Sequence, residues 1–238
     1  MKDKNFIKNF NDKCLLRRDK QQKISNCIAI GGMISAGKTT VCEELVKKYN
    51  FTFIPELSND ESDLMNVLLK KMYEREIIAN SVCQLQFILG RYEKYKSSNL
   101  EVKPNEILVF DRTIFEDRLF AFHNMLDEPS VYEYYEKLWR DKVHELLYNV
   151  GTPKLYIILT LDWSLFKKRI YQRNRKIEID NFKLNETYFR LLNETYLPYL
   201  KNICNAYSIP YIIINASLPL KEKIKIIDKE LKELKIIK

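Results

Sequence analysis

The chain has 238 residues, of which 46% are hydrophobic and 30% are charged, and its formal net charge is +8. This balance is expected of a globular protein with a sizeable core, and no apolar run approaches the roughly 20 residues that cross a bilayer. The five cysteines are odd in number and form no C-x-x-C pair, which argues against a disulfide framework and a zinc site.

Residues 1–22 are polar and basic, and we expect them to form a loosely docked arm. Residues 23–238 contain no linker rich in Pro, Gly or Ser and are expected to form one domain. Residues 27–30 are a short apolar run that is typical of a buried parallel strand. Residues 41–48 then show apolar residues at helical spacing with lysines in the last turn, which predicts a helix.

A glycine-rich segment joins this strand to this helix and matches the pattern G-x-x-x-x-G-K-[ST]. Glycine has no Cβ and permits the positive φ angles that turn backbone N–H groups toward a phosphate. Lys38 is expected to reach the β- and γ-phosphates, and Thr39 is expected to hold Mg²⁺. The strand and helix on either side favour a phosphate loop over a chance glycine-rich turn. The predicted ATP-binding residues of this loop are Gly32, Met33, Ile34, Ser35, Ala36, Gly37, Lys38, Thr39 and Thr40.

A second strand is predicted at residues 51–54, and Glu56 follows it. Ligands of open α/β sheets bind beyond the carboxyl ends of the strands, so Glu56 could face the phosphate loop. There it could accept the proton of an attacking hydroxyl group. From this residue alone, a carboxylate near the start of the next helix is an equally good interpretation.

Helical patterns cover residues 58–70 and 72–97. Tyr73, Gln84 and Arg91 are spaced 11 and 7 residues apart, so a single helix would bring them to nearly one face. An amide can pair with two edge atoms of a nucleobase, and a phenol can bond a sugar hydroxyl. Taken alone, this stripe is better interpreted as ordinary polar residues on a partly exposed helix.

A third strand at residues 107–111 ends in Asp111, an acid placed where phosphate-loop enzymes commonly hold Mg²⁺. Arg112 follows it and could neutralise charge on a transferred phosphoryl group. Asp117 lies one to two turns into the next helix, where it could brace an arginine. Another helix is predicted at residues 130–149.

A fourth strand is predicted at residues 155–161, and Asp162 after it is a good N-cap for a helix. From Lys167 to Lys176, six of ten residues are basic. Such a run could bind nucleic acid, or it could form a mobile lid whose arginines close over a triphosphate. The phosphate loop favours the lid.

The last predicted elements are a helix at 182–202, a strand at 209–215 and an amphipathic helix at 221–238. Strands and helices thus alternate along the chain. This order predicts an α/β fold of the P-loop kinase type, with a five-stranded parallel sheet, helices on both faces and an arginine-rich lid.

With these positions in order, the sequence resembles the deoxyribonucleoside kinase family from about residue 24 to residue 238. The resemblance implies transfer of the ATP γ-phosphate to the 5′-hydroxyl of a deoxynucleoside, with Glu56, Arg112 and Lys38 as catalytic residues. Glu56 would be the base, although its neighbouring proline precedes it here instead of following it. The family's acid-Arg-Ser motif is present with Asp111 as the acid and threonine in place of serine.

The resemblance also implies an acceptor pocket and a lid. Tyr73 and Glu178 would hold the sugar, Gln84 would read the base, and Arg91 would pair with Asp117. The lid, at about residues 169–180, would bring arginines to ATP. These arginines are Arg169, Arg173 and Arg175. The family resembles a dimeric one that is built through helices. This resemblance implies that the present chain forms a homodimer as well.

We therefore expect a cytoplasmic deoxynucleoside kinase of nucleotide salvage that uses ATP, or another nucleoside triphosphate, with Mg²⁺. A purine, and deoxyadenosine first, is the favoured acceptor, although Gln84 can pair with adenine or cytosine by rotating its amide. One alternative is thymidylate kinase or another nucleoside monophosphate kinase, which would need additional positive charge for the acceptor's phosphate. The other is a nucleotide-dependent nucleic-acid-binding protein with a basic surface, and the predicted acceptor pocket argues against it.

Overall fold

The computed structural model describes residues 23–56 and 63–238. The expected arm at residues 1–22 lies outside the described residues, and so does the start of the helix expected from residue 58. Within the described part of the chain, no helix is both long and apolar enough to cross a membrane.

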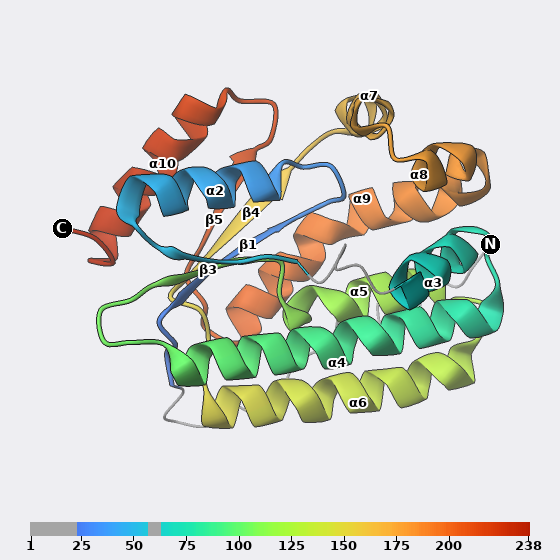
Figure 1. The fold of residues 1–238 in the computed structure, drawn as a ribbon, viewed down its shortest axis with the longest axis horizontal. Coiled ribbons are helices and arrows are strands. Elements are labelled where there is room, and N and C mark those ends of the chain that lie inside the picture. Colours follow the sequence, from blue (N-terminus) through green and yellow to red (C-terminus); the bar gives the residue numbers. More distant parts are fainter. Residues whose placement is uncertain (1–22, 57–62) are drawn as a thin grey trace.

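A parallel sheet of five strands forms the centre of the fold, in the order β2-β3-β1-β4-β5 (Figure 1). Strands β1, β3 and β4 are almost entirely buried and apolar, as expected for strands that are covered on both faces. The predicted five-stranded parallel sheet is confirmed. The strands are β1 (Cys27–Gly32), β2 (Thr52–Ile54), β3 (Leu108–Asp111), β4 (Leu155–Thr160) and β5 (Tyr211–Asn215).

Helices cover both faces of this sheet (Figure 1). One face carries α2 (Lys38–Tyr49) and α10 (Leu220–Glu233), which pack against each other. The other face carries α4 (Ile77–Glu101), α5 (Ile114–Asn124), α6 (Pro129–Asn149) and α9 (Phe182–Ala206). Three shorter helices gather beyond the carboxyl ends of the strands, at the right in Figure 1: α3 (Asp63–Tyr73), α7 (Trp163–Arg173) and α8 (Lys176–Asp180).

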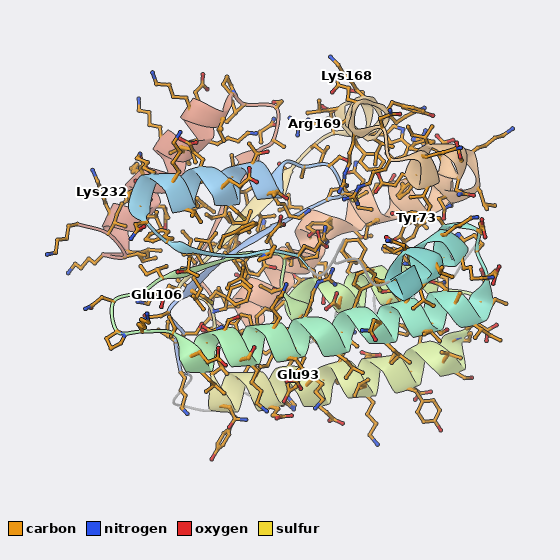
Figure 2. All side chains as sticks on the ribbon, viewed as in Figure 1. Tyr73, Glu93, Glu106, Lys168, Arg169 and Lys232 are labelled. Atoms are coloured by element: carbon orange, nitrogen blue, oxygen red, sulfur yellow. The ribbon has the colours of Figure 1, made fainter. Side chains whose placement is uncertain are left out.

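Many charged side chains project from the outer surface of these helices into solvent (Figure 2). Glu93, Lys168 and Lys232 are examples, and all three are exposed. The sequence neighbour of Lys168, Arg169, is half-buried and turns toward the interior. The basic run on α7 therefore includes both a solvated lysine and an arginine that faces the phosphate loop.

The prediction of a single helix over residues 72–97 is wrong, because two helices meet there. Helix α3 ends at Tyr73, and α4 begins at Ile77. Between them, Arg75 has a φ of 66°, a left-handed backbone conformation that does not continue a helix. Tyr73 therefore does not share a helix face with Gln84 and Arg91. The other predicted elements agree in type and order with those observed.

Candidate active site

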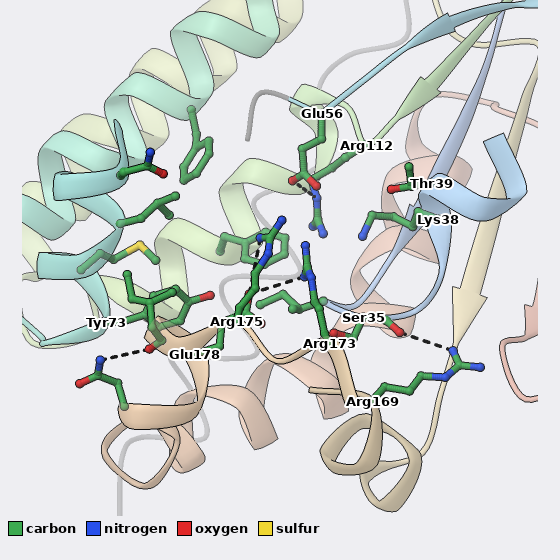
Figure 3. Close-up of a pocket in the computed structure, with 18 of the residues that line it drawn as sticks. Ser35, Lys38, Thr39, Glu56, Tyr73, Arg112, Arg169, Arg173, Arg175 and Glu178 are labelled. Carbon is green, nitrogen blue, oxygen red and sulfur yellow. Dashed lines mark hydrogen bonds and ion pairs between the residues drawn. The ribbon is translucent and has the colours of Figure 1, made fainter. Parts of the chain in front are cut away.

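A pocket of about 1180 Å³ opens beyond the carboxyl ends of the strands (Figure 3). The phosphate loop and α2 line one end of it, α3 and α4 line the other, and the segment from α7 to α8 borders it. Most of the side chains singled out in the sequence meet there. Those that line the pocket are Ile34, Ser35, Gly37, Lys38, Thr39, Thr40, Glu56, Tyr73, Gln84, Arg91, Arg112, Arg169, Arg173, Arg175 and Glu178.

The phosphate loop makes a tight turn between β1 and α2. Ser35 and Gly37 both have left-handed backbones, with φ angles of 61° and 87°. The Lys38 side chain is 7% exposed, and its Nζ lies 3.4 Å from the carbonyl oxygen of Met33. Burial lowers the pKa of Lys38, as does the positive charge of Arg112, while nearby carboxylates oppose the shift. The loop thus presents a buried cation at the edge of the pocket.

Thr39 and Asp111 form a pair of oxygen ligands next to this loop. The Thr39 hydroxyl donates a hydrogen bond to Oδ2 of Asp111 at 2.5 Å, and Oδ1 of this buried carboxylate has no hydrogen-bond partner among the described residues. Hydroxyl and carboxylate oxygens are ligands that Mg²⁺ prefers, and it commonly takes the rest of its shell from substrate phosphates and water. These two side chains fit a magnesium ion.

Glu56 lies between two arginines at the centre of the pocket. Its Oε1 is 2.8 Å from Nη2 of Arg91 and 2.8 Å from Nε of Arg112. Burial by itself would raise the pKa of Glu56, but the charges of Arg112, Lys38 and Arg91 outweigh it and hold the pKa far below its ordinary value. Glu56 is therefore a carboxylate at neutral pH and faces the phosphate loop (Figure 3).

Gln84 and Arg91, both on α4, stand at the far end of the pocket. Gln84 is 2% exposed, its Oε1 has no hydrogen-bond partner among the described residues, and its Nε2 lies 3.4 Å from the weak acceptor Sδ of Met72. Arg91 donates to Asp117 and stacks over the ring of Phe87. Burial raises the pKa of Asp117, although Arg91 opposes this shift. Gln84 thus keeps its amide available while Arg91 is fixed in place.

Tyr73 of α3 and Glu178 of α8 lie near each other at the same end of the pocket (Figure 3). The Tyr73 backbone carbonyl accepts a hydrogen bond of 2.7 Å from Nδ2 of Asn185, which fixes the end of α3 against α9. Burial and the neighbouring Glu178 raise the pKa of Tyr73, so its phenol stays protonated. Oε1 of Glu178 is 3.5 Å from Arg173 and 3.7 Å from Arg175.

The three arginines of the predicted lid lie in two different settings. Nη1 of Arg169 donates to the backbone carbonyl of Ala36 at 3.1 Å, and its Nη2 donates to the carbonyl of Ala216 at 2.8 Å. Arg169 therefore braces the phosphate loop through its backbone carbonyls. Arg173 and Arg175, in contrast, reach into the pocket toward Glu178.

Sequence analysis missed Glu116 and Tyr196, which lie directly behind Arg112. Glu116 is fully buried and forms an ion pair with Arg112 at 3.2 Å. The one signal in the sequence was a capping box, with Thr113 as N-cap and Glu116 three residues later. That pattern predicts the start of a helix and gives no indication of a contact with the site.

Comparisons with known proteins indicate the family of this chain. Residues 28–237 match the profile of the deoxynucleoside kinase family. The chain is 43% identical over 216 residues to "Uncharacterized protein MG268" of Mycoplasma genitalium, covering 90% of this chain and 93% of that protein. It is 27% identical to deoxyguanosine kinase of Bacillus subtilis, over 75% of this chain and 80% of that one.

A solved structure of deoxyadenosine kinase from M. mycoides with bound dATP has the same fold. Its TM-score is 0.71 at 26% identity, and the match covers 87% of this chain and 99% of that one. The P-loop kinase fold and the nucleotide-binding kinase activity expected from the sequence are thereby confirmed. The chain belongs to the deoxynucleoside kinase family.

Proposed function

We propose that this kinase transfers the γ-phosphate of ATP to the 5′-hydroxyl of a purine deoxynucleoside in nucleotide salvage, with deoxyadenosine preferred. The observation that carries this proposal is one pocket with a cationic phosphate loop at one end, an uncharged amide at the other, and Glu56 between them. The names of two relatives, a deoxyguanosine kinase and a deoxyadenosine kinase, support a purine acceptor.

Glu56 is the proposed base. As the 5′-oxygen bonds to the γ-phosphorus, the bond to the leaving ADP oxygen breaks, and the hydroxyl proton passes to the Glu56 carboxylate. A carboxylate with so low a pKa is a weak base, so the proton transfer comes late and orientation of the hydroxyl contributes most. This suits a reaction whose catalysis depends mainly on positioning and charge neutralisation.

Positive side chains neutralise the charge that develops on the phosphoryl group. Lys38 and Arg112 do so from the floor of the pocket, and Arg173 and Arg175 do so from the lid when it closes over ATP. Thr39 and Asp111 would hold Mg²⁺, which supplies further positive charge to the phosphate oxygens.

Tyr73 and Glu178 hold the deoxyribose, and Gln84 pairs with the edge of the base. Arg91, oriented by Asp117, borders the same base site. The pair of Tyr73 and Glu178 at this end of the pocket suits the hydroxyl groups of an uncharged sugar. This arrangement argues against a nucleoside monophosphate kinase.

A homodimer through α4 is also proposed. Its outer face carries an apolar stripe at spacings of four, three and four residues, which lies on one side of a helix. The exposed fractions range from 37% to 80%. The stripe consists of Ile78, Val82, Leu85 and Leu89. A monomer in sedimentation velocity at micromolar protein would contradict this assignment.

Residues 23–238 are proposed to act as one kinase domain, because the helices and loops packed around one sheet supply the side chains of the site. A cytoplasmic location suits an enzyme that consumes ATP and whose described cysteines are all free thiols. No role is assigned to nucleic acid. Salt-dependent binding of this protein to DNA or RNA would contradict the proposal that nucleic acid has no role.

The test of the acceptor is a competition assay with Mg²⁺-ATP and equal concentrations of the four deoxynucleosides. We expect deoxyadenosine monophosphate to form fastest and deoxyguanosine monophosphate next. Faster phosphorylation of deoxycytidine or thymidine would contradict the purine assignment. A parallel reaction with Glu56→Gln serves as the control for transfer by any contaminating kinase.

A further inference from the structure

A closed ring of buried hydrogen bonds joins the phosphate loop to Arg112. The backbone N–H of Gly32 donates to the hydroxyl oxygen of Tyr196 at 2.8 Å, and the Tyr196 hydroxyl donates to Oε2 of Glu116. The same Oε2 accepts a bond of 3.2 Å from Nη1 of Arg112. Nη2 of Arg112 closes the ring by donating to the carbonyl of Gly32 at 3.2 Å. We call these four residues the Gly32 ring.

The two oxygens of the Glu116 carboxylate do different things. Oε1 accepts from the backbone N–H of Thr113, which caps α5, and from the hydroxyl of Tyr156 at 2.7 Å. Oε2 has no part in the cap and serves only the ring. Capping of α5 therefore accounts for the contacts of Oε1 but gives no local structural reason for those of Oε2.

The backbone next to the ring is shaped around it. A Cβ built on Gly31 would lie 2.6 Å from Cε1 of Tyr156 and 3.2 Å from Oε1 of Glu116. The 2.6 Å contact would force a shift, so only glycine fits at this position while the Tyr156 ring stays in place. Gly31 lies outside the phosphate-loop pattern, and the packing of Tyr156 and Glu116 gives the physical reason for it.

Burying the Glu116 carboxylate is costly, because charged groups lose their hydration. Burial raises the pKa of Glu116, and the charge of Arg112 opposes that shift. Replacing a buried ion pair with well-packed apolar side chains of similar volume is often neutral or stabilising. Stability alone therefore does not account for an acid at this position.

Arg112 connects the ring to the reacting groups. Its Nε lies 2.8 Å from Oε1 of Glu56, and its backbone has a φ of 70°, a strained conformation for a residue other than glycine. We propose that Glu116 and Tyr196 are positioning residues that fix the Arg112 guanidinium between Gly32 and Glu56. The inference rests on the proposed role of Arg112 in neutralising the transferred phosphoryl group.

The test compares Tyr196→Phe with Tyr199→Phe on the same helix. The Tyr199 hydroxyl is also buried but donates to the carbonyl of Phe115, outside the ring. Tyr196→Phe loses the hydrogen bonds to Gly32 and to Glu116, whereas Tyr199→Phe loses the one to Phe115, so we expect both melting temperatures to fall and that of Tyr196→Phe to fall further. Only Tyr196→Phe is expected to lower kcat, by about tenfold to a hundredfold, because small displacements of catalytic groups are costly. Equal kcat values for the two variants would overturn the proposal.

A double-mutant cycle shows whether Tyr196 acts through Arg112. In the Arg112→Lys background the ring is already broken, so Tyr196→Phe should lower kcat further by less than about threefold. The same loss in both backgrounds would overturn the proposal. Glu116→Gln keeps the shape of the side chain and removes its charge. It should lower kcat at least as much as Tyr196→Phe, and a wild-type kcat would contradict the proposal.

Amide hydrogen exchange at Gly32 gives a readout that does not depend on activity. Exchange of the Gly32 amide should be faster in Tyr196→Phe than in wild type and unchanged in Tyr199→Phe. Unchanged exchange in Tyr196→Phe would overturn the ring itself. Absence of nucleoside phosphorylation by the wild-type enzyme would instead contradict the proposed function and leave this measurement valid.

Discussion

Two clusters of buried polar side chains lie at opposite ends of strand β1, and they differ in kind. At the amino end, the Ser25 hydroxyl lies 3.0 Å from Sγ of Cys27 and 3.1 Å from the Tyr95 hydroxyl, and it donates to a backbone carbonyl. These groups are neutral at physiological pH, since burial raises the pKa of Cys27 to about 11. The neutral groups of this cluster form hydrogen bonds with one another, and they close this end of the sheet.

At the carboxyl end, most of the buried polar groups are charged, and some of their atoms have no hydrogen-bond partner among the described residues. Glu56 faces Arg91 and Arg112, while Oδ1 of Asp111 and Oε1 of Gln84 have no hydrogen-bond partner among the described residues. Polar atoms buried without partners are rare in stable proteins because they cost free energy. The difference indicates that the amino-end cluster contributes stability, whereas the carboxyl-end cluster is arranged for ligands.

The largest expected effect comes from Glu56→Gln at the charged end. Loss of the base should lower kcat by about a thousandfold, with a much smaller effect on nucleoside binding. Steady-state kinetics with Mg²⁺-ATP and deoxyadenosine measure both quantities. Glu93→Gln, on the exposed face of α4, is the matched control and should keep wild-type kinetics. Equal losses of turnover and binding in Glu56→Gln would contradict the base assignment.

A smaller, selective effect is expected from Gln84→Ala. Removing the amide should lower kcat/KM for the preferred deoxynucleoside by about tenfold to a hundredfold, because two hydrogen bonds to the base are lost. Competition among the four deoxynucleosides should then show reduced discrimination. Gln86→Ala changes the same residue type at an exposed position of α4 and should leave selectivity intact. Unchanged selectivity in Gln84→Ala would show that another residue reads the base.

The charge on Glu56 also predicts a pH dependence of stability. Its pKa is lower in the folded protein than the ordinary value of 4.5, so its ionised form stabilises the fold above that value. This contribution is lost as the pH falls through the folded pKa. The melting-temperature difference between wild type and Glu56→Gln should be constant above about pH 5.5 and should narrow below about pH 4.5. A melting-temperature difference that grows on acidification would contradict this prediction.

The smallest effect on activity is expected at the closed end. Tyr95→Phe removes one hydroxyl from the neutral cluster and should cost about 1 kcal/mol of stability. For a chain of this length, that corresponds to a decrease of about 2–4 °C in melting temperature. The Tyr95 hydroxyl is within hydrogen-bond distance of Ser25, Cys27 and the carbonyl of Gly151, none of which lines the large pocket, so kcat should equal that of wild type. A lowered kcat in Tyr95→Phe would contradict the proposed difference between the two clusters.

Local patterns were sufficient to predict most of the fold. The phosphate loop, the five strands and Asp111 at the tip of β3 follow from short apolar runs and a contiguous motif. The break between α3 and α4 could not be predicted in this way. Its central residue, Arg75, adopts a left-handed backbone without the glycine that usually marks such a conformation.

Contacts between distant segments were beyond the reach of these patterns. Glu116 and Tyr196 are 80 residues apart, and neither lies in a recognisable site motif. The different setting of Arg169 depends on carbonyls of the phosphate loop and of Ala216, which no spacing along the chain reveals. Sequence patterns therefore indicated which side chains meet at the pocket. The residues that hold those side chains in place could be identified only from the three-dimensional structure.

The central claim is that the charged end of the sheet transfers a phosphoryl group to an uncharged 5′-hydroxyl at Glu56. The most direct measurement compares initial rates with Mg²⁺-ATP on the four deoxynucleosides and, in parallel, on their 5′-monophosphates. We expect turnover on at least one deoxynucleoside and none on the monophosphates. Turnover on a monophosphate alone would contradict it and would mean that Tyr73 and Glu178 do not hold an uncharged sugar.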